Sequence, residues 1–152
     1  MTHLKAGDKA PGFSCKDQEG EAHTLKDYSG RRLVLYFYPR DNTPACINQA
    51  CNLRDHFPEL VQSGYAVLGI SMDDERKHQK FAEKYELPFP LLADTGREMI
   101  DAYGVWGEKK FMGRIYDGIH RTTFVINEKG KIERIIEKPK TKAHAEEILT
   151  NF

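Results

Sequence analysis

The sequence predicts an α/β protein with a mixed central β-sheet flanked by helices. Two short apolar segments, residues 32–38 and 66–71, have the β-branched and aromatic content of buried strands. A stretch of helical periodicity separates them, so the three segments should form a right-handed parallel crossover. A later pair of strand-like segments, joined by a turn that contains glycine, adds antiparallel pairing and makes the sheet mixed.

Size and composition indicate one globular unit. The chain has 152 residues, which fits a single domain over residues 1–152. Its 23 basic and 23 acidic side chains cancel, which argues against nucleic acid or a membrane surface as a partner. The start of the chain lacks the apolar core of a secretory signal, and no segment is apolar for long enough to span a bilayer. We therefore expect a cytoplasmic protein.

The helix between the two central strands has one apolar face and one irregularity. The face consists of Cys46, Ala50, Leu53, Phe57 and Val61. Gly64 should end the helix. Pro58 lies inside the pattern, so the helix should kink or break near residues 54–57.

Hairpins are expected at both ends of the sequence. Residues 13–15 and 22–25 flank a polar turn near the start. Residues 122–126 and 131–136 flank a second turn, at 127–130.

The other segments predict two helices and a loop. One helix is expected over residues 75–85, before two prolines break the pattern, and another over 141–150. The Gly-rich stretch 104–118 should be a loop whose aromatic side chains cover the core. The alternative is that these side chains line a surface for a substrate or a partner.

Cys46 lies where a helix is expected to begin. Thr43 has the character of an N-cap and Pro44 fits the first helical position, which makes Cys46 the third helical residue. Backbone N–H groups in the first turn and the positive end of the helix dipole favour a thiolate over a thiol. Because the thiolate is the nucleophile, Cys46 is the candidate reactive group. The alternative is a small apolar residue that only fills the core.

The other two cysteines need separate explanations. In an intact helix the α-carbons of Cys46 and Cys51 would lie roughly 8–9 Å apart, beyond the ~7 Å limit for a disulfide. The pair can therefore bond only if the helix unwinds locally. A zinc site is disfavoured, because the spacing is not Cys-x2-Cys and only scattered histidines could complete it.

Cys15 has neither a helix start nor a nearby cation, so we expect it to be structural.

The segment from Phe37 to Cys46 contains the spacing Pro-x-x-x-Thr-x-x-Cys, followed by Ala50-Cys51 and Arg54-Asp55. It resembles the peroxidatic motif of peroxiredoxins. The position of Cys51 is similar to that in the atypical two-cysteine group called peroxiredoxin Q or bacterioferritin comigratory protein. The resemblance covers nearly the whole chain, and it implies a thioredoxin-like fold.

This resemblance implies a thiol-dependent peroxidase. Cys46 would attack the O–O bond of hydrogen peroxide or an organic hydroperoxide, and Cys51 would convert the resulting sulfenic acid into an intramolecular disulfide. Thr43 would position the peroxide, Arg121 would hold the thiolate and the polarised oxygens, and Pro39 would shield the pocket. A thioredoxin-like reductant would restore the thiols. No cofactor or metal would be needed, and a monomer would suffice.

Two other functions stay open at this stage. The first is thiol–disulfide exchange on proteins, although the chain has no Cys-x-x-Cys and no proline before the strand at 122–126. The second is a non-enzymatic binding or holdase module in which both cysteines are incidental. Ala45 stands where peroxiredoxin relatives more often have glycine, which should alter the rate rather than the function.

Overall fold

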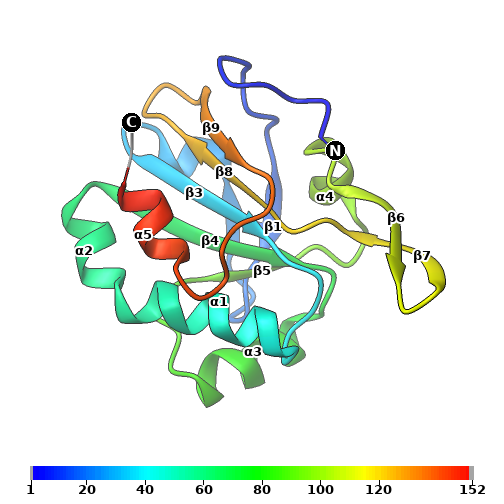
Figure 1. Ribbon diagram of the computed structural model, residues 1–152. Helices are drawn as coiled ribbons and strands as arrows, with labels where there is room; N and C mark the ends of the chain where they lie inside the picture. The colour runs from blue at the N-terminus through cyan, green and yellow to red at the C-terminus, as the bar shows by residue number, and fades with distance from the viewer. Residues whose placement is uncertain (1, 151–152) are drawn as a thin grey trace.

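The computed structural model describes residues 2–150 and has a mixed sheet at its centre (Figure 1). The sheet has five strands in the order β5-β4-β3-β8-β9. Their bounds are β3 Arg32–Phe37, β4 Tyr65–Ser71, β5 Leu91–Ala93, β8 Thr122–Ile126 and β9 Ile132–Ile136. Strands β3, β4 and β5 are parallel, whereas β8 pairs antiparallel with both β3 and β9. The α/β class with a mixed sheet is confirmed.

Both faces of the sheet are buried beneath helices. Successive residues of β3 point alternately into two core clusters: Leu33 and Leu35 into one, Val34 and Tyr36 into the other. The helices are α1 Pro44–Asp55, α2 Phe57–Gln62, α3 Glu75–Lys84, α4 Glu98–Ala102 and α5 His144–Leu149, with the 3-10 turn η1 Leu25–Tyr28. Helices α1, α2, α3 and α5 contribute to the cluster around Val34 and Tyr36. α4 and η1 contribute to the opposite cluster.

The expected break in the first helix is present at His56. α1 ends at Asp55, and α2 begins at Phe57 with Pro58 in its first turn. The prediction for Val61 is wrong, because its side chain is 47% exposed while Leu60 is fully buried. After the break at His56, the buried position in α2 is therefore Leu60 rather than Val61.

The hairpins are partly as expected. β1 Ser14–Lys16 pairs with β2 Ala22–Thr24, and β8 pairs with β9, as predicted. The expected loop over 104–118 is wrong: β6 Trp106–Phe111 and β7 Arg114–Ile119 form a further hairpin that projects from the body (Figure 1). Met112 and Gly113 at its tip both have positive φ, as in the tight turns that suit hairpins.

The aromatic side chains of this region divide into two groups. Tyr103 is buried in the core, as expected. Phe111 is 64% exposed and Tyr116 is also exposed, so neither covers the core. The last helix begins at His144, later than residue 141. Within residues 2–150 no helix is long and apolar enough to cross a membrane.

The close packing of β3 against β4 predicts a cost for enlarging Gly69. Gly69 lies opposite Tyr36 in the strand register, and a Cβ at Gly69 would lie 2.8 Å from Tyr36 Cζ and 2.9 Å from Leu91 Cδ2. Gly69→Ala should lower the free energy of unfolding by about 1–3 kcal/mol, measured by urea denaturation. Gly12→Ala is the control, because a Cβ at Gly12 meets nothing within 4 Å. Equal stability of the two variants would contradict this packing.

The burial of Cys15 predicts an unreactive thiol. Cys15 lies in β1 and belongs to the core, where burial, and secondarily the charge of Asp94, raises its pKa to about 12. Iodoacetamide at pH 8 should therefore leave Cys15 unmodified in the folded protein and label it in urea, as read by peptide mass mapping. Labelling of native Cys15 as fast as of half-buried Cys51 would contradict the assignment of Cys15 to the core.

Candidate active site

The start of α1 places Cys46 in the first helical turn. Thr43 has extended backbone angles (φ −87°, ψ 148°) and precedes Pro44 at the start of the helix. The Thr43 side chain does not cap the helix. Its hydroxyl donates instead to the Arg40 carbonyl at 3.2 Å. The oxygen of Thr43 thus keeps its lone pairs available to accept a hydrogen bond from another group.

Arg121 reaches Cys46 because of the sheet topology. Thr122, the first residue of β8, pairs with Phe37, the last residue of β3. Arg121 therefore lies at the end of the sheet where the chain enters α1. Its Nη2 donates to the Cys46 sulfur at 3.2 Å, and Cys46 is only 1% exposed. A guanidinium keeps its charge at any relevant pH, so it is a fixed cation beside this sulfur.

Gln49 is a site residue that the sequence analysis missed. It lies one turn after Cys46 on the same face of α1, and it is fully buried. Its Oε1 accepts from Arg121 Nη1 at 2.7 Å, which orients the guanidinium toward Cys46. Its Nε2 has no hydrogen-bond partner within residues 2–150. A polar residue on the apolar face of a predicted helix was the available signal.

Pro39 and Thr43 line a cavity of about 690 Å³ between the loop before α1 and the β6–β7 hairpin. The hairpin contributes Trp106, Phe111 and Tyr116 to its wall. Lys109, also from the hairpin, lines both this cavity and a smaller one beside Arg121. Burial, and secondarily the charge of Arg121, lowers the pKa of Lys109. The hairpin thus brings a lysine and an aromatic wall beside Pro39 and Thr43. Cys46 and Arg121 are not among the residues that line this cavity.

Cys51 shares α1 with Cys46 and is not bonded to it. Both thiols are free, and α1 runs through both positions without a break. The helix is tied down just after Cys51, because Asn52 Oδ1 accepts from the Ala145 N–H at 2.7 Å and Asn52 Nδ2 donates to the Lys142 carbonyl at 3.1 Å. These bonds anchor the second half of α1 to the start of α5.

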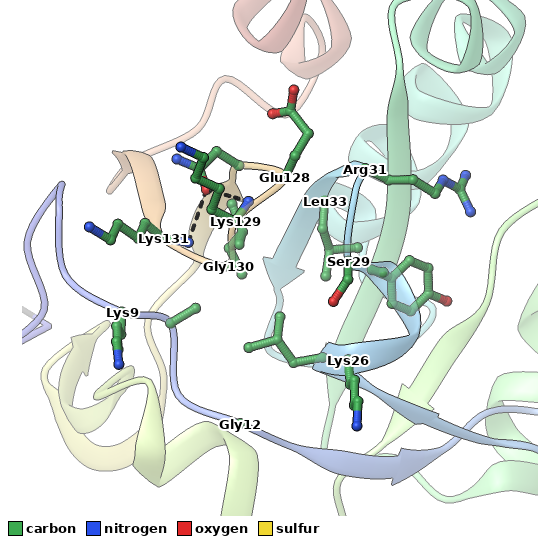
Figure 2. A pocket seen from close by; sticks show the side chains of 15 residues that line it. Lys9, Gly12, Lys26, Ser29, Arg31, Leu33, Glu128, Lys129, Gly130 and Lys131 are labelled. Carbon is green, nitrogen blue, oxygen red and sulfur yellow. Dashed lines mark hydrogen bonds between the residues drawn. The ribbon is translucent and has the colours of Figure 1, made fainter.

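A separate pocket of about 480 Å³ lies at the other end of β3, near Leu33 (Figure 2). Lys9, Lys129 and Lys131 stand on its rim. None of the predicted site residues lines it. We therefore place the candidate chemistry at the start of α1, where Arg121 contacts Cys46 and Gln49.

Comparison with known proteins shows the family to which the chain belongs. The sequence pattern that defines the AhpC/TSA family matches residues 6–135. Peroxiredoxin Bcp of Escherichia coli K12 is 50% identical over 149 residues, which are 98% of this chain and 96% of the relative. Peroxiredoxin Bcp of Bacillus subtilis 168 is 41% identical over 146 residues, which are 96% and 93% of the two chains.

Solved structures similar to this chain are also peroxiredoxins. A PrxQ variant from Xylella fastidiosa superposes with a TM-score of 0.90 at 33% identity, covering 97% of this chain and 94% of its own. Peroxiredoxin Q of Xanthomonas campestris has a TM-score of 0.85 at 32% identity, covering 90% and 87%. These structures confirm the thioredoxin-like fold. The chain belongs to the AhpC/TSA family, as a thiol-dependent peroxidase of the peroxiredoxin Q/Bcp group.

Proposed function

We propose that Cys46 is the sulfur that reduces hydrogen peroxide and organic hydroperoxides in this peroxiredoxin. The observation that carries the assignment is the 3.2 Å contact between the Arg121 guanidinium and the Cys46 sulfur in the first turn of α1. A fixed cation and the helix start both favour the thiolate that this chemistry needs.

The first step is a displacement at oxygen. The Cys46 thiolate attacks the terminal oxygen of the peroxide, the O–O bond breaks, and the leaving alkoxide or hydroxide takes up a proton. Arg121 lies where it can stabilise the negative charge that develops on the leaving oxygen. Because the Thr43 hydroxyl donates to the Arg40 carbonyl, its oxygen is free to accept a hydrogen bond from the peroxide O–H. Pro39 lines the same cavity and would limit the entry of water.

The second step joins Cys46 to Cys51. The thiol of Cys51 attacks the sulfenic acid, which forms a disulfide and releases water. Since one uninterrupted helix carries both residues, the segment from Pro44 to Cys51 must unwind first. The bonds of Asn52 to the start of α5 favour unwinding that stops there. The rest of the fold would then stay in place during turnover.

The remaining steps need other molecules. A thioredoxin-like reductant would reduce the disulfide and return α1 to its helical form. Because Cys51 supplies the resolving thiol within the same chain, a monomer is sufficient. We further propose that residues 1–152 act as one domain in the cytoplasm, without a metal or a cofactor.

Replacement of the two cysteines separates the steps. Cys46→Ser should abolish peroxide consumption, because it removes the thiol that Arg121 contacts. Cys51→Ser should leave the first oxidation intact and accumulate sulfenic acid on Cys46, whereas the parent protein should acquire an internal disulfide. Stopped-flow kinetics and intact mass after peroxide treatment measure these outcomes. Cys15→Ser is the control, with unchanged kinetics. Undiminished peroxide consumption by Cys46→Ser would refute the assignment.

Replacement of Gln49 tests the orientation of Arg121. Gln49→Leu removes the bond to Arg121 Nη1, so Cys46 oxidation should slow by about tenfold, in line with the ~1.5–3 kcal/mol of a hydrogen bond to a charged group. Gln62→Leu, at an exposed position of α2, is the matched control. Rates of Cys46 oxidation by hydrogen peroxide in both variants measure the effect. Equal rates would mean that Arg121 does not need Gln49.

A further inference from the structure

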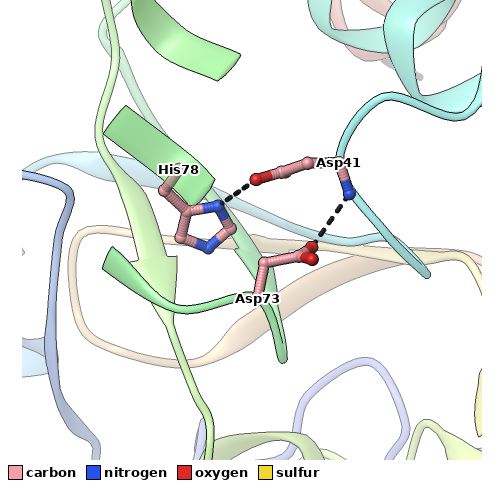
Figure 3. A group of neighbouring side chains, drawn as sticks. All are labelled: Asp41, Asp73 and His78. Atoms are coloured by element: carbon pink, nitrogen blue, oxygen red, sulfur yellow. Dashed lines mark hydrogen bonds and ion pairs between the residues drawn. The ribbon is translucent and has the colours of Figure 1, made fainter. Parts of the chain in front are cut away.

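The loop between β3 and α1 is held by one buried carboxylate, that of Asp41 (Figure 3). Its Oδ1 accepts from the Tyr38 hydroxyl at 2.7 Å, and its Oδ2 lies 2.7 Å from His78 Nδ1. Its backbone N–H donates to Asp73 Oδ2 at 2.9 Å. Asp41 therefore connects the loop to the end of β3, to α3 and to the segment after β4.

The hydrogen-bond partners of His78 indicate which of its ring nitrogens carry a hydrogen. The side chain is fully buried, and Nε2 lies 2.9 Å from the Leu92 carbonyl. Because a carbonyl only accepts, Nε2 must carry a hydrogen. A proton must also lie between Nδ1 and the Asp41 carboxylate, since two bare acceptors would repel at 2.7 Å. The Asp41–His78 pair thus shares one proton and has no net charge, which makes its burial tolerable.

The other partners of Asp41 are fixed as well. Burial, and secondarily the charge of Asp41, raises the pKa of Tyr38 well above its ordinary value, so its hydroxyl remains a donor. Asp73 Oδ2 accepts from the Ser71 hydroxyl at 2.6 Å in addition to the Asp41 N–H. These bonds leave Asp41 little freedom to move.

The loop needs this support because of its backbone. Asn42, next to Asp41, has a φ of 63°, in the left-handed region that costs free energy for a residue with a side chain. Thr43 follows directly as the N-cap and is joined to α1 through its carbonyl, which accepts from the Ile47 N–H at 2.9 Å, whereas Cys46 lies inside the first turn of α1. Loss of the Asp41 contacts should therefore displace Thr43 more than Cys46.

We propose that His78 is a positioning residue, which acts through Asp41 to hold Thr43 and Pro39 where Thr43 meets the peroxide. The inference rests on the proposed role of Thr43, and His78 itself does not touch the substrate. This role of His78 should affect two reactions of Cys46 differently. Peroxide reduction needs an aligned peroxide and depends on His78, whereas alkylation by iodoacetamide depends on the thiolate beside Arg121 and needs no aligned peroxide.

The experiment compares these two rates in the full chain. Cys46 oxidation by hydrogen peroxide is followed by rapid quench and mass spectrometry, and Cys46 alkylation by iodoacetamide is followed in the same way. His78→Leu and Asp41→Ala should slow oxidation by about 10- to 100-fold, the range expected when a positioning group shifts. Alkylation should stay within about threefold of the parent rate, since the helix start and Arg121 are unchanged.

Conservative variants should rescue the oxidation rate. Asp41→Asn can accept from Tyr38 through Oδ1 and donate from Nδ2 to a neutral His78, so it should stay within about threefold of the parent rate. His78→Asn can still donate to Asp41 and should recover most of the loss. The matched control is Asp17→Ala, which breaks another Asp–His pair, that of buried Asp17 and half-buried His23 in the N-terminal hairpin. It should change neither rate.

The outcomes are distinguishable. Oxidation of His78→Leu within threefold of the parent rate, or an equal loss of alkylation, would overturn the proposal. If His78→Leu does not fold, Asp41→Ala decides, because it removes the carboxylate through which His78 would act. An unaltered oxidation rate in folded Asp41→Ala would overturn the proposal. Failure of the parent protein to be oxidised at Cys46 would refute the proposed function instead.

Discussion

The contact between the Arg121 guanidinium and the Cys46 sulfur is the interaction around which this site is built. It joins residues far apart in the chain, and it exists because β8 begins beside the residue where β3 ends. The parallel crossover from β3 to β4 sends α1 away from that point, with Cys46 in its first turn. The permanent positive charge of the Arg121 guanidinium thereby lies beside the buried sulfur of Cys46.

Helix α1 has to meet two opposed requirements. In the proposed cycle it must be intact to hold Cys46 in the first turn, in contact with Arg121. In the proposed cycle it must also unwind before Cys51 can reach Cys46. The structure divides the helix accordingly, with its second half tied to α5 through Asn52 and ended at the break before Pro58. In the proposed cycle, unwinding would then be confined to the turns that carry the two cysteines.

The loop before α1, unlike the helix itself, is held in one geometry. Asp41 fixes it through buried polar contacts with Tyr38 and His78, whereas the neighbouring wall of the cavity is the exposed β6–β7 hairpin. A fully hydrogen-bonded buried network costs little and specifies one geometry. Thr43 and Pro39 are thus attached to the rigid side of the cavity, and the hairpin forms its other side.

The sequence by itself determined the α/β class, the strands at the centre of the sheet, the helix start at Cys46 and the break near Pro58. Each of these depends on signals within a few residues: apolar periodicity, an N-cap with proline, and a missing N–H. It did not determine the β6–β7 hairpin, whose strands are charged and Gly-rich, or the partners Gln49, Asp41 and His78. Those contacts were decided by the tertiary structure, because they join separate elements whose distance depends on strand order and helix packing rather than on local pattern.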